Sequence, residues 1–356
     1  MVTEIGFWRA CWSSKTSSGV TLLLIAILAP LMWLVIDWGV LNAVWRPDLA
    51  ACDAACGSGA CWGVIAEKHR LILWGRYPFE QHWRPLLASL VMVALLAHSA
   101  RPVAWNQRLM LWWALAALLT WVLMAGRIGP WPLTPLGLPP VPTEQWGGLA
   151  LTLILSIVSI ALAFPLAIAL ALGRRSKLPI LRSVCAGLIE LVRGVPLVSV
   201  LFMASFMVPM LLPSGKSPDV LLRVMGALTL FLAAYLAEVV RGGLQGVAEG
   251  QGLAATALGL THWQTQQHIM LPQALVNSLP ALVNHFIGLF KDTSLVTIVS
   301  LYELSGALSL ALSGDADWRP FKIEAYVFIA LIYFVCCFSL SSYSQRWQLQ
   351  LTQRNR

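Results

Sequence analysis

The sequence predicts an all-α membrane protein that crosses the bilayer about eight times. Of its 356 residues, 58% are hydrophobic and only 11% are charged, which is too apolar for a soluble domain of this length. Uncharged apolar runs long enough to span a bilayer recur along the chain, and each predicts a transmembrane helix. The third observation is the 17 tryptophans, a residue type that gathers at membrane–water interfaces.

The first predicted span, at residues 20–37, follows Arg9 and Lys15 and is not followed by a small-residue cleavage site, so we expect it to stay uncleaved. The other spans are predicted at residues 86–100, 109–126, 147–172, 196–212, 221–241, 274–299 and 324–342. The run 86–100 is the shortest and carries His98. An even number of spans leaves both termini on one side of the membrane.

The loops divide the chain into four predicted segments. Residues 1–126 form an amino-terminal extension with three spans and a long, Trp-rich external loop that we expect to lie along the outer headgroups. Residues 127–146 are too proline-rich for a regular helix and form an external connection. Residues 147–345 form a core of five spans, and residues 346–356 form a cytoplasmic tail.

Positive charge sets the predicted orientation. The cluster Arg174-Arg175-Ser176-Lys177 fixes the end of the fourth span in the cytoplasm, which also puts both termini and residues 250–272 there. The net charge of +8 is interpreted as topology and lipid headgroup contact. No basic cluster with interleaved aromatic residues points to nucleic acid.

Residues 250–272 form an unusually polar, helix-forming segment between two apolar spans. Leu253 to Leu258 favour a helix that Gly259 can end in a left-handed conformation. Thr261 and Gln264 fit a capping box, so a second helix should begin at His262. Leu271 precedes Pro272, which predicts a stop at Leu271. A helical hairpin packed only on its own protein fits this pattern equally well.

Several charged residues fall in or beside the predicted spans. Lys291 and Asp292 are too polar to face lipid, so we expect them, with Thr293 and Ser294, to line or gate a solute pathway; a structural pair between helices is the alternative. Glu238 and Arg241 are three residues apart and are interpreted as structural. Residues 180–195 predict an interfacial helix on which Glu190 and Arg193 can pair, followed by a span from Pro196.

The cysteines and catalytic motifs set further limits. Cys52, Cys56 and Cys61 lie together in the external loop, where we expect one disulfide among them and one thiol left over; their spacing does not suit zinc. No phosphate-binding loop, zinc-protease motif or nucleophile elbow is present. We therefore expect no catalytic residue, no metal site and no ATP hydrolysis by this chain.

Short motifs in a fixed order resemble the permease subunits of bacterial ABC importers for amino acids, over roughly residues 146–345. The coupling motif is GQ-x-x-AA-x-x-LGL from Gly250. Before it come RGVP at 193–196 and AYLAEVVRGG at 234–243, and after it come LPQA from Leu271 and KDTSL from Lys291. WGRYP, WRP and PTEQWGG in the amino half resemble the larger permease of the general L-amino-acid importers.

In that family the motif that begins here at Gly250 is a coupling loop, which docks into a groove on a cytoplasmic ATPase. The resemblance assigns this role to Gly250, Gln251, Leu253, Ala254, Ala255, Gly259, Leu260 and Pro272. Ala254, Ala255 and Gly259 stand where the family has its two alanines and glycine. Leu253 stands at the family's glutamate position, a departure that puts an ion pair there in doubt but not the docking of the helix.

The resemblance implies a type I importer permease core in the inner membrane of a bacterium. It implies ABC ATPase subunits that bind ATP and magnesium, a second homologous permease and a periplasmic amino-acid-binding protein as partners, and no cofactor in this chain. Two alternatives stay open at this point: a secondary transporter or channel driven by an ion gradient, and a membrane scaffold that transports nothing.

Overall fold

The computed structural model describes residues 6, 9, 11–101, 106–213 and 217–354. The chain divides into two compact units, whose boundaries differ from those of the four predicted segments. The smaller unit consists of Met1–His69 and Leu312–Phe328, and the larger unit of Arg70–Ala311 and Ile329–Arg356.

The smaller unit combines a long apolar helix with a disulfide-linked loop. Helix α2 (Lys15–Ile36) has no buried residue, as expected for a helix that lipid surrounds. After α3 (Leu49–Ala55), a disulfide joins Cys52 to Cys61, while Cys56 is a free, exposed thiol. This confirms the expectation of one bridge and one remaining thiol. The buried Cys61 N–H donates to Glu324 at 3.0 Å, so the loop is held to the start of the last helix.

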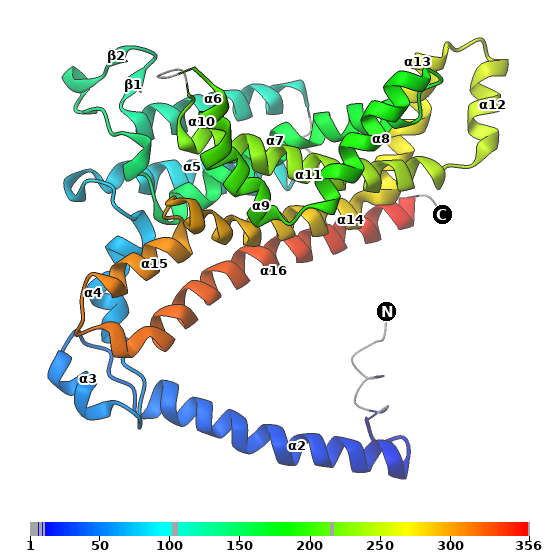
Figure 1. Cartoon of the computed structure of the whole chain (residues 1–356). Helices are drawn as coiled ribbons and strands as arrows, with labels where there is room; N and C mark the ends of the chain where they lie inside the picture. The colour runs from blue at the N-terminus through cyan, green and yellow to red at the C-terminus, as the bar shows by residue number, and fades with distance from the viewer. Residues whose placement is uncertain (1–5, 7–8, 10, 102–105, 214–216, 355–356) are drawn as a thin grey trace. The chain divides into compact units, whose positions relative to one another are not determined.

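The larger unit is a bundle of helices centred on α11 (Val220–Gln245), which packs against α7 (Gly148–Arg174) and α14 (Leu271–Asp292) (Figure 1). Its other helices are α5 (Trp83–Ser99), α6 (Gln107–Ala125), α8 (Pro179–Gly194), α9 (Leu197–Phe202), α10 (Val208–Leu211), α12 (Glu249–Ala257) and α13 (His262–Gln264). Helices α4 (Gly63–Trp74), α15 (Leu304–Ser313) and α16 (Lys322–Arg354) each have residues in both units. The proline-rich connection contains a short antiparallel pair, β1 (Arg127–Ile128) with β2 (Trp131–Pro132).

Six helical runs in the described residues are long and apolar enough to cross a membrane: Lys15–Leu41, Arg108–Ala125, Gly148–Arg174, Val220–Gln245, His262–Val299 and Arg319–Trp347. A seventh candidate is the pair α8 and α9–α10, which bends by 105° at the predicted break before Leu197. The remaining predicted span corresponds to α5, whose 17 residues extend about 25 Å, slightly short of a typical hydrocarbon core. The count is roughly that expected from sequence.

Small residues let α7 and α11 approach closely. Ala163, Ala167 and Ala171 recur every four residues along α7 and are fully buried. Ala233, Ala234 and Ala237 are fully buried on α11. Because lipid tails are as apolar as leucine, close packing of this kind is a main source of association between membrane helices.

The beginning of α7 is held in a tight meeting of backbones. Gly148 has φ +61°, and a Cβ atom there would lie 2.1 Å from the carbonyl oxygen of Leu73. A Cβ atom on Gly75 would lie 2.7 Å from the Cα atom of Gly147. The WGRYP and PTEQWGG segments therefore meet through glycine backbone, which no larger residue would allow.

At the same end of the larger unit, side chains donate hydrogen bonds to the last carbonyl groups of α6. The Arg84 side chain is fully buried and donates to the carbonyl oxygens of Leu123 and Pro139, the latter at 2.9 Å. The Tyr77 hydroxyl donates to the carbonyl oxygen of Met124 at 3.0 Å. These bonds supply donors that a helix end otherwise lacks.

Candidate functional site: a coupling elbow, a charge cluster and a cavity

The segment between α11 and α14 forms an exposed elbow. Helix α12 stands clear of the long helices and packs against the π-helical segment Thr265–Met270 (Figure 1). Gly259 ends α12 at φ +79°, with its N–H donating to the Thr256 carbonyl at 3.0 Å. The Leu260 N–H donates to the Ala255 carbonyl at 3.1 Å. These two bonds form a Schellman motif, so the predicted left-handed stop at Gly259 is confirmed.

The second arm of the elbow begins with the predicted capping box. The Gln264 N–H donates to the Thr261 hydroxyl at 3.3 Å, and the Thr261 N–H donates to the Gln264 side chain at 2.9 Å. The predicted stop at Leu271 is wrong, because Leu271 is helical and the chain continues into α14. The wider turns of the π-helical segment end there, and Pro272 is the second residue of α14.

The predicted coupling residues differ in exposure. Ala255 is buried and faces its own chain, and Leu260 is half-buried. Six are exposed: Gly250, Gln251, Leu253, Ala254, Gly259 and Pro272. Most of these residues are therefore accessible for contact with another protein, whereas Ala255 packs against the rest of the chain.

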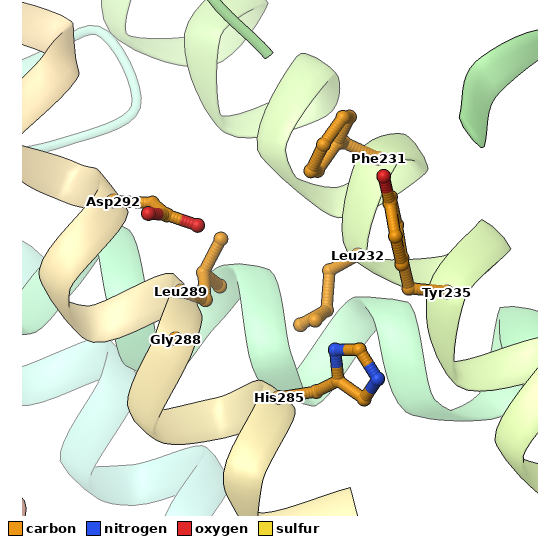
Figure 2. A pocket seen from close by; sticks show the side chains of 7 residues that line it. All are labelled: Phe231, Leu232, Tyr235, His285, Gly288, Leu289 and Asp292. Carbon is orange, nitrogen blue, oxygen red and sulfur yellow. The ribbon is translucent and has the colours of Figure 1, made fainter. Parts of the chain in front are cut away.

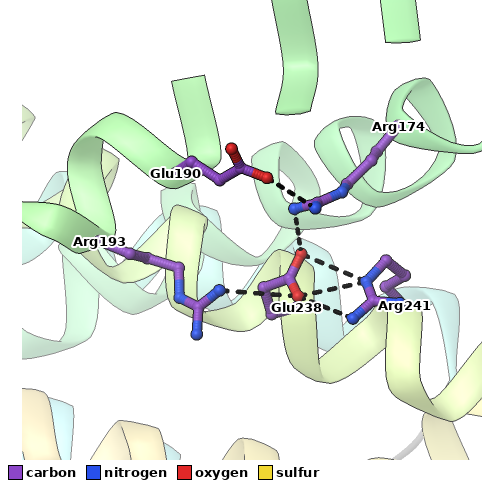
Figure 3. Close-up of polar contacts among 5 residues, drawn as sticks. All are labelled: Arg174, Glu190, Arg193, Glu238 and Arg241. Carbon is purple, nitrogen blue, oxygen red and sulfur yellow. Dashed lines mark hydrogen bonds and ion pairs between the residues drawn. The ribbon is translucent and has the colours of Figure 1, made fainter. Parts of the chain in front are cut away.

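A cluster of charges links α7, α8 and α11 (Figure 3). Glu238 lies among three arginines, at 2.7 Å from Arg174, 2.9 Å from Arg241 and 3.6 Å from Arg193. Glu238 and Arg241, which the sequence analysis interprets as structural, are in contact. Glu238 is only 16% exposed, so it shares its charge with all three guanidinium groups in a poorly solvated place.

The predicted pair of Glu190 with Arg193 is wrong. Glu190 instead binds Arg174 of α7 at 2.9 Å, while Arg193 turns toward Glu238 of α11. The spacing along α8 permits the local pair, but contacts with two neighbouring helices are available and join more of the structure. Long-range packing decides this choice, and the sequence of α8 alone does not report it.

A cavity of about 250 Å³ lies between α11 and α14 (Figure 2). It is lined by residues on the facing sides of the two helices: Phe231, Leu232 and Tyr235 on α11, and His285, Gly288, Leu289 and Asp292 on α14. The Tyr235 ring lies 5.7 Å from the His285 ring, and the Arg193 guanidinium lies 5.5 Å from the Tyr235 ring. Tyr235 thus borders both the cavity and the charge cluster.

The four residues predicted for the pathway are separated by the structure. Asp292 is half-buried and lines the cavity, whereas Lys291 is exposed and does not line it. Thr293 is buried, with its hydroxyl donating to the Phe290 carbonyl at 2.7 Å. Ser294 is half-buried. Helical spacing explains this, because neighbouring residues on a helix point in different directions.

Sequence reasoning did not single out Glu303, a fully buried carboxylate at the start of α15. It accepts hydrogen bonds from the N–H groups of Ser305 and Gly306 at 2.9 and 3.0 Å. Tyr333 donates to it at 2.8 Å, and Thr152 and Thr297 donate at 3.3 Å. Glu303 thereby connects α7, α15 and α16. In the structure Glu303 caps α15, but glutamate is not a preferred N-cap residue, so no sequence signal marks this role.

A family model described as "binding-protein-dependent transport system inner membrane component" matches residues 163–350, which hold the charge cluster, the elbow and the cavity. The chain belongs to this family. It is a multi-pass membrane permease, the transporting subunit of such a system.

The permease is similar along most of its length to two curated proteins. The inner membrane amino-acid ABC transporter permease protein YhdY of Escherichia coli is 43% identical over 343 residues, which cover 94% of this chain and 89% of that protein. The glutamate/glutamine/aspartate/asparagine transport system permease protein BztC of Rhodobacter capsulatus is 36% identical over 390 residues, covering 91% of this chain and 89% of that protein.

A solved structure supports the fold of the permease core. A chain described as belonging to an amino acid ABC transporter with histidines superposes with a TM-score of 0.51 at 30% identity. The match covers 57% of this permease and 92% of that chain. Family, relatives and fold thus agree on a type I importer permease.

Proposed function

We propose that this permease is the translocation subunit of an ATP-driven importer of L-amino acids, and that a separate ATPase chain binds ATP and magnesium. The observation that carries this proposal is the exposed elbow between two helices of membrane-spanning length. The elbow has well-formed caps and leaves most of its predicted coupling residues exposed. A lever that another protein grips requires these properties.

The elbow connects mechanically to the cavity. Helical structure is unbroken from His262 to Asp292, so the second arm of the elbow and the α14 wall of the cavity form one rod. ATP binding closes the ATPase pair and moves the elbow. The rod then shifts His285 and Asp292 relative to α11, which alternates the access of the cavity between the two sides.

The cavity suits a small zwitterionic solute. Its volume of about 250 Å³ lies just below the range of about 300–1,000 Å³ typical of pockets that bind drug-sized ligands. Asp292 offers a carboxylate to an ammonium group, and Phe231 and Tyr235 offer ring faces to a cation or to an apolar side chain. Both curated relatives are named for amino-acid transport, which supports this substrate class. Asp292 alone carries the proposed pathway role, because Lys291, Thr293 and Ser294 do not line the cavity.

In the proposed assembly, two ATPase subunits dock in the cytoplasm and a second, homologous permease pairs with this one in the inner membrane. A periplasmic amino-acid-binding protein delivers the solute outside. Both termini and the elbow lie in the cytoplasm, an orientation that the basic cluster Arg174–Lys177 supports. A thiol introduced by Thr256→Cys should therefore react with a membrane-impermeant maleimide in inverted vesicles and not in intact spheroplasts. The reverse pattern would contradict the orientation.

The decisive test is uptake of labelled amino acids driven by ATP. Gly259→Trp should abolish uptake and leave membrane insertion intact, because Trp at φ +79° is strained and adds bulk to the elbow. Gly57→Trp is a matched control, since Gly57 also has a positive φ and open space around it but lies in the smaller unit. Unchanged uptake in Gly259→Trp would contradict the lever. Uptake by this chain alone in proteoliposomes would instead favour a transporter driven by an ion gradient.

A further inference from the structure

The corner between α7 and α8 carries a dense group of basic side chains. Arg174, Arg175, Lys177 and Arg182 follow one another with no acidic residue among them. Two glutamates bind Arg174. The other three are exposed, and within the described part of the chain none of them forms an ion pair. We define Arg175, Lys177 and Arg182 as the basic corner.

Large apolar side chains project from the same corner. Every residue from 177 to 184 is exposed, so the beginning of α8 stands clear of the rest of the chain. Leu178 is 64% exposed, Ile180 is 79% exposed and Val184 is 62% exposed. Ile180 and Val184 are four residues apart on α8 and share one side of it. Basic and apolar groups thus meet in one place that suits neither bulk water nor hydrocarbon alone.

Two features of the helices place this corner at the surface of the membrane. Helix α7 has 27 residues and is about 40 Å long, which exceeds a hydrocarbon core of about 30 Å. Its last residues therefore reach the headgroup layer. The chain then bends by 105° between α8 and α9–α10, so α8 runs close to the membrane plane when α9–α10 enters the membrane.

Contacts within the chain hold the corner in shape. A Cβ atom on Gly173 would lie 2.5 Å from the buried Cys185 sulfur, so α7 and α8 touch closely there. Arg174 of α7 binds Glu190 of α8 at 2.9 Å. Because the backbone that carries the basic corner is already fixed, little conformational entropy is lost when a ligand binds.

We propose that the basic corner binds the phosphate of an anionic phospholipid, whose acyl chains cover Ile180 and Val184. Guanidinium and ammonium groups form charge-assisted hydrogen bonds with phosphate oxygens. The N-cap residue Leu178 has no side-chain acceptor, so the first N–H groups of α8 are also available to the phosphate. This lipid site is separate from the cavity and does not depend on the transport function. In the proposed orientation it lies in the cytoplasmic leaflet, whose surface is negatively charged.

A soluble anion or a protein partner suits the corner less well. Free phosphate would leave Leu178, Ile180 and Val184 exposed to water. A cytoplasmic protein would have to enter the headgroup layer to reach the exposed side of α8. A phospholipid brings a negative group and hydrocarbon in one molecule, in the layer where α7 ends.

The test is a titration of the purified permease, with any subunits that accompany it, with phosphatidylglycerol in mild detergent. Native mass spectrometry measures the bound lipid. Phosphatidylglycerol should bind at least about 10-fold more tightly than phosphatidylcholine with the same acyl chains, because phosphatidylcholine has no net charge. An excess of glycerol 3-phosphate should not displace it. Equal binding of the two lipids, or displacement by glycerol 3-phosphate, would overturn the proposal.

Substitutions then locate the lipid. Combining Arg175→Gln with Lys177→Gln should weaken phosphatidylglycerol binding about 25-fold, since each basic side chain near an anionic surface contributes about five-fold. Combining Arg175→Lys with Lys177→Arg keeps both charges and should keep the parent affinity. Arg346→Gln is the matched control, because Arg346 is an exposed arginine of α16 on the same predicted side of the membrane. Ile180→Ser should weaken lipid binding several-fold by removing an acyl-chain contact.

Each other outcome counts against the site. Unchanged phosphatidylglycerol binding in the glutamine double variant would overturn it, and loss in both double variants would show that charge is not what binds the lipid. If the glutamine variant keeps its lipid but loses a co-purifying subunit, the basic corner binds protein instead. Parent affinity in Ile180→Ser would remove the acyl chains from α8.

Discussion

The two ends of the larger unit treat polar and apolar groups in opposite ways. At the Glu303 end, a buried carboxylate accepts bonds from backbone and side-chain donors, buried Arg84 bonds to carbonyls, and backbones meet at Gly148 with no room for a side chain. At the α12 end, the Leu253 and Leu258 side chains are exposed, and nothing lies within 4 Å of a Cβ atom built on Gly250.

This difference separates what the chain completes by itself from what it leaves for a partner. A buried carboxylate that lacks hydrogen-bond donors lowers the stability of the fold. At the Glu303 end, the chain therefore has to supply these donors itself. Exposed leucines are costly only until a partner covers them. The contrast predicts that substitutions at the Glu303 end act on stability, and that equivalent substitutions at the α12 end act on assembly.

The largest expected effect is that of Gly148→Ala. The new Cβ atom meets the Leu73 carbonyl and the residue keeps a left-handed φ, so we expect the free energy of unfolding to fall by at least about 3 kcal/mol. Gly250→Ala is the counterpart at the α12 end, where the helix should gain about 0.5–1 kcal/mol. Thermal unfolding in detergent compares them. Equal melting temperatures for the two variants would contradict the contrast.

Glu303→Ala is expected to rank second. It leaves the N–H groups of Ser305 and Gly306 and the hydroxyl groups of Thr297 and Tyr333 without their acceptor, at a cost of about 3–5 kcal/mol. Glu303→Gln keeps part of the network and should cost about 1–2 kcal/mol. Glu249→Ala on exposed α12 should change stability by less than about 0.5 kcal/mol. Denaturant titration measures all three, and a neutral Glu303→Ala would show that the network is dispensable.

Substitutions in the charge cluster should change the free energy of unfolding by an amount between those expected at the Glu303 end and at the α12 end. Glu238→Gln leaves Arg174, Arg193 and Arg241 without their shared carboxylate in a site where Glu238 is 16% exposed, and we expect a loss of about 2–4 kcal/mol. Glu190 is 65% exposed, so Glu190→Gln should cost less than about 1 kcal/mol. Unfolding midpoints of the two single variants test this order, which a larger effect at Glu190 would reverse.

The smallest expected effect is a dependence of stability on pH at His82. Burial lowers the pKa of the His82 imidazole, the nearby Arg70 lowers it further, and a hydrogen bond to the Tyr77 carbonyl partly opposes this. The unfolded chain then takes up a proton at a higher pH than the folded chain. This stabilising contribution is complete above the ordinary histidine pKa, near 6.5, and is lost as pH falls from there toward the lowered pKa.

Melting temperatures between pH 7.5 and about pH 5 measure this dependence. His82→Asn, which cannot titrate, should flatten the fall in melting temperature in the lower part of that range. An identical slope in the parent and the variant would assign the acid sensitivity to other groups.

The sequence by itself determined the features that depend on neighbours along the chain. Apolar runs predicted most of the spans, because insertion into a bilayer depends on the composition of each segment. The stop at Gly259 and the capping box at Thr261 were predictable because their hydrogen bonds reach only three to five residues along the chain. The single disulfide was expected because three cysteines share one loop, although the choice of Cys61 over Cys56 was not.

Only the tertiary structure decided the contacts between distant segments. Glu190 pairs with Arg174 of another helix and not with the nearby Arg193. Leu271 is helical and follows a π-helical segment, although it precedes Pro272. Asp292 faces the cavity while Lys291 does not, since that choice depends on how α14 is rotated against α11. Glu303 gathers donors from α7 and α16, across 151 and 30 residues of chain. Such choices follow from which helices pack together, a property of the folded chain as a whole.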